Sequence, residues 1–432
     1  MRSLNIMRIT HIFGNNKYIP IKDNDYNSNT LRYKELIKII SESRMDISDS
    51  LADELANLKN NIETFYFDLK YLQMLWAKEN GLKINDENWM EQILLEQINK
   101  VKPEVIFFQK FLPLKKNTLL NLKKKFHFIK KIVYHTAYLG TTWGGFAVDH
   151  LLVGTPSLVH RYKKIGMEPK LFYHYFDPRI TEKIKVPSNF SEKKYDFTFV
   201  GSSGFNGGYL HADRFYFLKY LLEKTDILMW VSEEDSSEIY KKTFKQKIRE
   251  ISKIFIKSLP IKLIEKIIIA GCMSNLLLET KNEKLFYIKG GKLPNKKLQD
   301  MYPLRCFQSV HGLDYYSIIA NSKISFTKSG NNIHSPEYSQ FGDVGALRLF
   351  ETTGLESCLV ADNGKNMHDL FEDGKEIICY VTKEEALEKI KYLLDNPNYC
   401  KQIAENGKKK TYKSHLAKNR AELFCAIING DI

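Results

Sequence analysis

The sequence lacks paired cysteines: its six cysteines are scattered, and none belongs to a C-x-x-C motif. This spacing argues against a disulfide framework or a cysteine zinc site and favours a reducing cytosol. Long apolar runs are also missing. The nearest, at 267–278, is interrupted by polar residues and is shorter than the roughly 18–20 residues that cross a bilayer. Segment 1–14 has no small-residue cleavage site, so we expect a first β-strand there rather than a signal peptide.

Positive charge is in excess, with 65 Lys and Arg against 51 Asp and Glu, for a net charge of +14. This balance favours an anionic partner, such as nucleic acid, anionic lipid or a phosphorylated substrate. No helix-turn-helix, zinc or RNP-type motif supports nucleic acid, and we expect no such partner.

Apolar runs of strand length alternate with helical patterns, which predicts parallel sheets in an α/β protein. Strands are expected at 7–14, 104–109, 131–138, 150–155, 170–176, 196–201, 226–231, 323–329, 357–362 and 376–381. Helices are expected at 212–224, 345–353 and 383–395. At 432 residues, two domains are expected, divided within the polar segment 175–195. We predict domains at 1–190 and 191–432, with an all-helical excursion at about 31–100 and a basic helical insertion at about 233–303.

The basic insertion places Phe244, Ile248, Ile251 and Phe255 on one helical face among lysines and arginines. Segment 240–266 therefore has two interpretations. It could lie on an anionic membrane surface, or it could pack on its own domain with a solvated basic face.

The segment "GDVGALRLFETTG" (342–354) brings two acids and an arginine together. Arg348 and Glu351 lie three apart, away from the expected sheet-facing side of the helix, so a surface ion pair is one interpretation. Alternatively, the glycine-bearing loop with Gly345 leads into a helix N-terminus that attracts a phosphate. A carboxylate one turn on could then accept hydrogen bonds from sugar hydroxyls of a nucleotide or nucleotide-sugar.

A second glycine-rich loop, "FVGSSGFNGG" (199–208), follows an expected strand and precedes the helix that carries Arg214. Such loops let the backbone approach a diphosphate. The loop matches neither the P-loop nor the G-x-G-x-x-G pattern, and an ordinary strand-to-helix turn remains an alternative.

Segment 345–410, which runs from "GALRLFETTG" through "LFEDGKE" to a helix ending in Asn-Pro, resembles the donor-binding half of known enzymes. It is similar to GT-B-fold glycosyltransferases of the group 1 superfamily, closest to their CgeB-like branch. The similarity extends more weakly to "YDFTFVGSSG" and to 310–329, and into the first domain. It implies two Rossmann-like domains that face a central cleft.

The resemblance implies that Glu351 contacts the donor's ribose. Asp343 occupies the first place of the family's acid pair, where a glutamate is usual, with seven residues between the acids. The base is expected at Val310, His311 and Gly312, and the diphosphate at Ser202, Ser203 and Gly204, with Lys328 as a cationic partner.

The predicted reaction is a metal-independent sugar transfer, with no cofactor, from a nucleotide-diphosphate-sugar to an acceptor held by the first domain. Arg348, Lys328 and Arg214 are expected to stabilise the leaving diphosphate. The only short Asp-x-Asp, Asp23 and Asp25, does not end a predicted strand. If the reaction inverts the anomeric centre, a general base is expected from the first domain, with His135 the first candidate and Asp149 the second. A buried histidine satisfied by the backbone is the alternative interpretation of His135.

The expected acceptor is a glycan, a lipid-linked sugar or a surface polysaccharide, and the expected location is cytoplasmic, with a peripheral membrane position left open. Two other functions stay open: a GT-B-fold nucleotide-sugar epimerase, and a non-catalytic nucleotide- or glycan-binding module.

Overall fold

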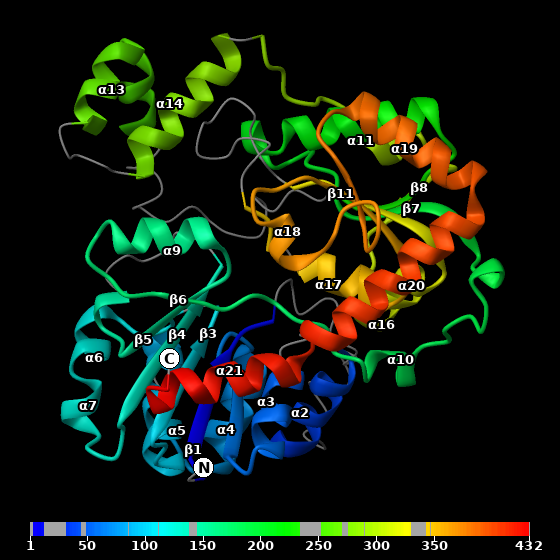
Figure 1. Cartoon of the computed structure of the whole chain (residues 1–432). Helices are drawn as coiled ribbons and strands as arrows, with labels where there is room; N and C mark the ends of the chain where they lie inside the picture. The colour runs from blue at the N-terminus through cyan, green and yellow to red at the C-terminus, as the bar shows by residue number, and fades with distance from the viewer. Residues whose placement is uncertain are drawn as a thin grey trace.

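The computed structural model describes residues 3–12, 32–44, 49–84, 86–110, 112–137, 145–233, 252–269, 275–288, 290–329, 343–345 and 347–431. It consists of two α/β halves, each built around a parallel sheet of six strands (Figure 1). The fold class predicted from the alternation of strands and helices is confirmed.

The first sheet has the strand order β2-β1-β3-β4-β5-β6. Its strands are β1 (Asn5–Thr10), β2 (Asn61–Tyr66), β3 (Val105–Gln109), β4 (Lys131–Thr136), β5 (His150–Val153) and β6 (Lys170–Leu171). The helices of this half are α2 (Tyr33–Glu42), α3 (Asp49–Asn57), α4 (Lys70–Glu79), η2 (Asp86–Asn88), α5 (Trp89–Val101), α6 (Lys116–Leu120), α7 (Leu122–Lys125) and α9 (Pro156–Lys163).

The second sheet has the order β12-β11-β10-β7-β8-β9. Its strands are β7 (Tyr195–Ser202), β8 (Leu228–Ser232), β9 (Cys306–Gln308), β10 (Ser322–Thr327), β11 (Cys358–Asp362) and β12 (Ile378–Tyr380). The remaining helices are α10 (Ile180–Lys183), η3 (Phe190–Glu192), η4 (Gly208–Leu210), α11 (Ala212–Lys224), α13 (Ile261–Ile269), α14 (Asn275–Ile288), α15 (Leu298–Met301), α16 (Gly312–Ala320), α17 (Leu347–Gly354), α18 (Met367–Leu370), α19 (Lys383–Asp395), α20 (Pro397–Ser414) and α21 (Ala417–Asn429).

Both sheets are covered on both faces, because their strands carry apolar side chains on each side. In β1, Met7 and Ile9 belong to one core cluster, whereas Ile6 belongs to the cluster on the opposite face. Parallel strands buried on two faces have near-continuous apolar sequences, which explains why most strands were recognisable from the sequence.

The chain crosses between the halves twice, and the two crossings touch. Phe176 and Leu416 form a bridge, and the Phe176 N–H donates to the His415 carbonyl at 2.8 Å. Beyond this point α21 returns to the first half, where the ring of Phe424 lies 4.8 Å from that of Phe107 (Figure 1). The proposed domain division after residue 190 falls between the two sheets, but the C-terminal helix completes the core of the first half.

The predicted all-helical excursion at 31–100 is wrong, because it contains β2, which pairs in parallel with β1 at the edge of the first sheet. Phe65 has helical spacing with Leu69 and Leu72, yet it lies in β2, and the helix α4 starts only after it. The strand predicted at 170–176 is also reduced to the two residues of β6. Helices predicted at 212–224 and 383–395 coincide with α11 and α19.

Much of the predicted amphipathic basic helix, including Phe244, Ile248 and Ile251, lies outside the described residues, as do Asp23 and Asp25. Within the described ranges, no helix is long and apolar enough to span a bilayer.

Candidate functional site

The order of the second sheet locates a ligand crevice. The strand order reverses between β7 and β10: from β7 the following strands β8 and β9 are added on one side, and from β10 the strands β11 and β12 are added on the other. Ligands of open α/β sheets bind outside the carboxyl ends of the strands at such a switch point. The loop after β7 and the residues after β10 therefore form the expected floor of the site.

The loop after β7 has a shape that requires glycine. Gly204 has a φ of +89°, and a Cβ at this position would lie 2.4 Å from the carbonyl oxygen of His211. The hydroxyl oxygens of Ser202 and Ser203 accept hydrogen bonds from the N–H groups of Gly204 and Phe205, both at 3.2 Å. The structure thus brings Ser202, Ser203 and Gly204 into one tight turn in front of α11.

Arg214 and Arg348 converge on this turn from two helices. The Nη1 of Arg214 lies 3.4 Å from the carbonyl oxygen of Ser202. The guanidinium of Arg348 lies 2.7 Å from the point that a Cβ on Gly201 would occupy. In the described part of the chain, the Nε of each arginine is buried and has no hydrogen-bond partner.

Among the described residues, neither arginine forms an ion pair with a carboxylate, although Asp362 lies near Arg214 and Glu351 near Arg348. Burial, followed by the charge of Arg348, lowers the pKa of Arg214 to about 10, so Arg214 stays protonated at neutral pH. Asp362 is nearby, but it accepts from the Ser329 N–H and forms no ion pair with either arginine. Two adjacent cations with unused N–H donors are the arrangement expected of an anion site.

Lys328 follows β10, the strand on the other side of the switch point. It is buried, and its Nζ lies 6.0 Å from the centre of the Phe217 ring on α11. Lys328 is therefore on the same edge of the sheet as the glycine-rich loop, as expected from the sequence.

Glu351 is 5% exposed in α17 and holds two tyrosine hydroxyls of α16. Its Oε2 accepts from Tyr315 at 2.8 Å and its Oε1 accepts from Tyr316 at 3.0 Å. Burial raises the pKa of Glu351, and the Tyr315 hydroxyl, Arg348, the Tyr316 hydroxyl and Lys110 oppose this shift. The interpretation of Arg348 and Glu351 as a surface ion pair is wrong, because α17 is buried on most of its circumference.

Asp343 and Gly345 lie against the first half of the chain. Asp343 Oδ2 accepts a hydrogen bond from the Ser157 N–H at the start of α9. A Cβ on Gly345 would lie 2.6 Å from the carbonyl oxygen of Gly154, so only glycine permits this approach. Since residues after β10 touch residues after β5, the carboxyl edges of the two sheets face each other.

Val310, His311 and Gly312, where the base is expected, lie at the beginning of α16 and are all partly exposed. Gly312 has a φ of +57°, and His311 is the residue that precedes the helix. The same helix carries Tyr315 and Tyr316, so α16 connects the expected base position to Glu351.

His135 lies near the carboxyl end of β4, and the structure buries it. Its ring is 5.4 Å from that of Phe172 and 5.8 Å from that of His174. Burial, together with His174, lowers the pKa of His135 to about 3, so its imidazole is neutral at physiological pH. Neither ring nitrogen has a hydrogen-bond partner with good geometry among the described residues.

The prediction that Asp149 projects into the cleft is wrong. Asp149 precedes β5, and its Oδ2 accepts from the Ile132 N–H near the start of β4, at 2.6 Å. Its other oxygen pairs with Lys123. Asp149 therefore lies at the amino edge of the first sheet, opposite to the edge that faces the second half.

Sequence reasoning missed four residues of this region: Lys110, His211, Tyr315 and Tyr316. Lys110 directly follows β3 with a φ of +79° that is unusual for a residue other than glycine, and its N–H donates to the His135 carbonyl at 2.9 Å. His211 lies under the glycine-rich loop. The adjacent tyrosines were a visible signal, but no spacing rule links them to Glu351, which is 35 or 36 residues away.

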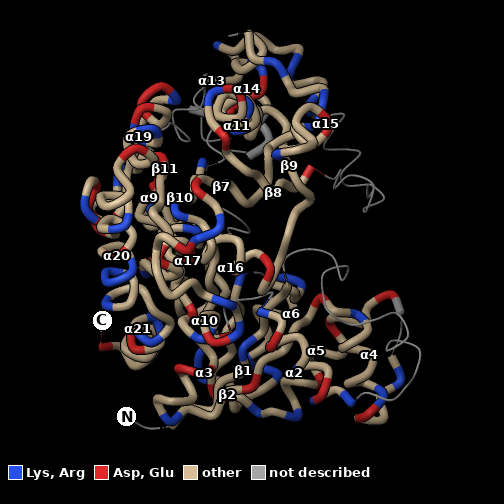
Figure 2. The backbone as a smooth tube through the Cα atoms, turned by 90° about the vertical axis from the view of Figure 1, so that its right-hand side faces the viewer, with Lys and Arg blue, Asp and Glu red and all other residues tan. Residues whose placement is uncertain are grey.

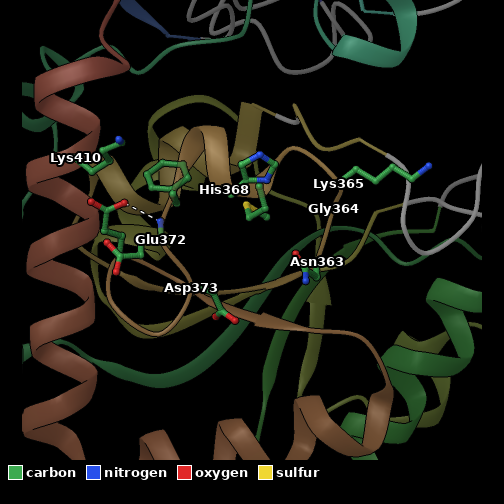
Figure 3. A pocket seen from close by; sticks show the side chains of 10 residues that line it. Asn363, Gly364, Lys365, His368, Glu372, Asp373 and Lys410 are labelled. Carbon is green, nitrogen blue, oxygen red and sulfur yellow. Dashed lines mark hydrogen bonds between the residues drawn. The ribbon is translucent and has the colours of Figure 1, made fainter.

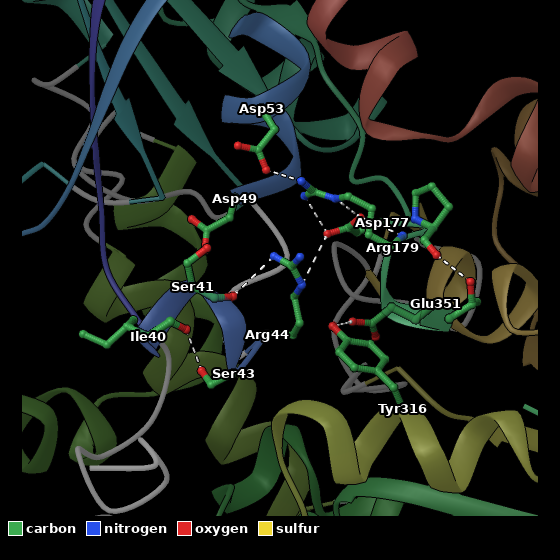
Figure 4. A network of polar contacts seen from close by, with 12 residues as sticks. Ile40, Ser41, Ser43, Arg44, Asp49, Asp53, Asp177, Arg179, Tyr316 and Glu351 are labelled. Carbon is green, nitrogen blue, oxygen red and sulfur yellow. Dashed lines mark hydrogen bonds and ion pairs between the residues drawn. The ribbon is translucent and has the colours of Figure 1, made fainter. Parts of the chain in front are cut away.

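A polar network lies where the chain crosses between the halves (Figure 4). Asp177 is completely buried and accepts from the backbone N–H and the guanidinium of Arg179, with Arg44 4.0 Å away. Arg179 also pairs with Asp53 of α3. Figure 4 places Tyr316 and Glu351 beside this network, so the acid of the site is close to the crossing segment.

A pocket of about 580 Å³ opens elsewhere on the second half, beside α18 and α20 (Figure 3). Its lining includes Lys365, His368, Glu372, Glu376 and Lys410, and none of the predicted site residues. Because its acids and lysines are mixed and its lining follows β11 and not β7 or β10, we do not assign the ligand to it.

Solved structures define the class of fold. Sucrose-phosphate synthase from Thermosynechococcus elongatus superposes with a TM-score of 0.54 and 10% identity, over 99% of each chain. HepE of Anabaena, solved with UDP and glucose, gives 0.53 and 9%, again over 99% of each chain. A glycosyltransferase from Rickettsia africae gives 0.52 and 9%, over 99% of this chain and 98% of that one. The chain therefore has the GT-B fold.

A family model described as glycosyl transferase-like matches residues 276–426, from within α14 to within α21. This match includes β10, α17 and β11, and thus Lys328, Arg348 and Glu351. No curated protein sequence matches the chain.

Proposed function

We propose that the protein is a glycosyltransferase that moves a sugar from a nucleotide-diphosphate-sugar to an acceptor bound in the first half. The observation that carries the proposal is the pair Arg214 and Arg348, which lie at the glycine-rich turn of the switch point and whose buried Nε–H donors have no partner among the described residues. The match to a glycosyl transferase-like family over the same half supports it.

The leaving diphosphate gains negative charge as the sugar departs, and the proposed role of the two arginines is to stabilise that charge. Fixed cations in a site partly shielded from water act more strongly than they would in bulk water. Lys328 adds a third positive charge at the neighbouring strand end. The chain can supply this stabilisation from its own side chains, so the proposed transfer needs no metal.

Glu351 is proposed to bind the ribose, either in addition to its two tyrosine partners or in place of one of them. A carboxylate can accept about four hydrogen bonds, and two are already provided by Tyr315 and Tyr316. The tyrosines fix the orientation of the carboxylate before a ligand arrives, which reduces the entropy cost of binding.

His135 is the proposed general base on the acceptor side, since Asp149 lies at the wrong edge of the sheet. Its low pKa keeps the imidazole unprotonated and able to accept a proton from an acceptor hydroxyl. The same low pKa makes His135 a weak base. To act as a general base, it must also lie within hydrogen-bond distance of the acceptor hydroxyl.

One observation favours a second candidate, a binding module without catalysis. Asp343 is engaged with the Ser157 N–H and Glu351 with two tyrosines, so both acids of the expected pair already have partners.

The experiment that separates these functions is an incubation of the purified chain with a panel of nucleotide-sugars, with and without a preparation of glycan and lipid-linked acceptors. Release of nucleoside diphosphate that depends on the acceptor supports the transferase. Binding of a nucleotide-sugar with no turnover under either condition would favour the binding module, and conversion of the sugar without acceptor would favour the epimerase.

A further inference from the structure

The helical insertion of the second half exposes large apolar side chains. Five of them belong to the described side chains of 252–288: Ile254, Phe255, Leu263, Tyr287 and Ile288. Ile254 and Phe255 are 70% and 66% exposed, which is unusual for residues of this size. We call these five residues the insertion surface. A concentration of exposed apolar groups in one short segment marks an interaction site more often than isolated ones do.

Lysines are interleaved with the apolar residues. On α13, Lys262 and Lys266 lie one turn apart and flank Leu263, and all three are exposed, whereas Ile264 is fully buried. Residues 252–288 contain six lysines and three glutamates, a net charge of 6 − 3 = +3. Lys and Arg are visible along α13 and α14 in Figure 2.

Hydrogen bonds hold the insertion surface in place. Lys284 of α14 donates to the carbonyl oxygens of Lys257 and Leu259, at 3.0 and 2.7 Å, and Lys257 pairs with Glu283 at 2.7 Å. The segment that carries Ile254 and Phe255 is thereby fastened to α14. The exposed side chains are presented by packed helices.

The insertion is anchored next to the candidate donor site. Phe286 of α14 is buried against Tyr209 and Ala212, which lie between the glycine-rich loop and the start of α11. Figure 1 shows α13 and α14 standing away from the second sheet, on the side where α9 of the first half lies. A surface bound through this insertion would therefore lie on the side of the second half where α14 packs beside the glycine-rich loop.

We infer that the insertion surface docks on an anionic lipid bilayer. Apolar side chains set among lysines are the combination that binds the membrane interface, because apolar residues enter the headgroup region and lysines meet anionic lipid. A partner protein with an acidic face would meet the lysines but would leave Ile254 and Phe255 without the deep apolar contact that acyl chains give. The further step, that the bilayer presents a lipid-linked acceptor to the cleft, rests on the proposed function.

The test is co-sedimentation of the full chain with vesicles, without donor or acceptor, so its result does not depend on glycosyl transfer. Vesicles of phosphatidylcholine alone are compared with an equal mixture of phosphatidylcholine and phosphatidylglycerol. Binding to the mixed vesicles is expected, weakened by salt, with little binding to phosphatidylcholine alone. Lys262→Glu with Lys266→Glu is expected to weaken binding about tenfold or more, since each lysine near an anionic surface contributes measurably. Ile254→Ser with Phe255→Ser is expected to weaken it to a similar extent.

Two matched controls carry the same changes elsewhere on the exposed surface, Lys116→Glu with Lys391→Glu and Leu120→Ser with Tyr392→Ser. They are expected to bind as the wild type does. The inference is overturned if mixed vesicles do not sediment the folded chain, or if the insertion variants bind no differently from the controls. It is also overturned if light scattering shows a dimer that Ile254→Ser with Phe255→Ser dissociates, since the surface would then join two copies of the chain.

Discussion

The two halves of the molecule differ in how the arginines near their sheets are hydrogen-bonded and paired with acids. In the first half, Arg8 of β1 is fully buried, and its guanidinium donates to Asp49 at 2.9 Å, to Gln109 at 2.7 Å and to Thr64 at 3.2 Å. In the second half, Arg214 and Arg348 lie beside each other, and the buried Nε of each has no hydrogen-bond partner among the described residues.

The difference separates structural charge from functional charge. A buried arginine that serves the fold is paired, because an isolated buried charge costs several kcal/mol. Two adjacent arginines with unused donors are tolerated only if another gain offsets their cost, and binding of a diphosphate would provide it. The comparison leads to four predictions, which start with the largest effect.

Arg8→Met is expected to destabilise the fold by about 3–5 kcal/mol, because it leaves the Asp49 carboxylate buried without its cation. Urea unfolding measures the loss. Adding Asp49→Asn should restore part of the stability, since the uncompensated charge is then removed. An Arg8→Met protein as stable as the wild type would contradict the claim that Arg8 serves the fold through its ion pair with Asp49.

Arg348→Gln is expected to weaken nucleoside diphosphate binding by about 1.5–3 kcal/mol, roughly tenfold to a hundredfold, which is typical of a lost hydrogen bond to a charged group. The stability of the unliganded protein should fall by no more than about 1–2 kcal/mol, because Arg348 loses its ring contacts with Phe199 and Tyr315 and its interaction with the Tyr315 hydroxyl. Thermal unfolding with and without nucleotide measures both effects. Arg32→Gln, an exposed arginine of the first half, serves as the control.

His135→Phe tests a buried titratable group of the first half through the pH dependence of the unfolding free energy. The folded-state pKa of His135, about 3, is below its ordinary value of 6.5, so the unfolded chain binds the proton more readily. Stability is therefore lost as pH falls from about 6.5 toward 3, and the loss between pH 7 and pH 5 is about 2 kcal/mol from this residue. The variant should lack that part of the loss in unfolding experiments at the two pH values. An identical pH dependence in both proteins would contradict the buried, neutral state of His135.

Asp343→Asn is expected to have the smallest effect, a loss of about 1 kcal/mol or less in unfolding free energy, through its contact with the start of α9. Since asparagine can still accept the Ser157 N–H, a transferase rate close to that of the wild type would assign Asp343 to the contact between the halves. A large fall in the transferase rate with unchanged stability would instead assign Asp343 a role in the reaction.

The sequence was sufficient for the elements that repeat a simple pattern. Five of the six strands of the second sheet, β7, β8, β10, β11 and β12, and the helices α11 and α19 follow from apolar runs and from the Asn396-Pro397 stop, whereas the short edge strand β9 was missed. The strand β2 was missed, because Phe65 has a spacing that suits a helix as well as a strand, and only pairing with β1 decides between them. Such pairing joins segments 56 residues apart, which no local pattern reveals.

The sequence was sufficient to predict those site residues that lie at the carboxyl end of a predicted strand or on the helix that follows it. The glycine-rich loop, Arg214 and Lys328 lie at strand ends or at the helix that follows, and the structure brings them to one edge of the sheet. The tyrosine partners of Glu351 and the attachment of Asp343 to α9 depend on contacts between elements. The error for Asp149 has the same origin, because a residue between β4 and β5 can lie at either edge of the sheet until the strand limits are known.

The most direct test of the central claim is a calorimetric titration of nucleoside diphosphates and the matching monophosphates into the wild type and into Arg214→Gln with Arg348→Gln. We predict that one diphosphate binds the wild type clearly more tightly than its monophosphate, and that the double variant loses this preference while it stays folded. A folded wild type that binds no nucleoside diphosphate, or a double variant that keeps the preference, would contradict the assignment of the two arginines to a diphosphate.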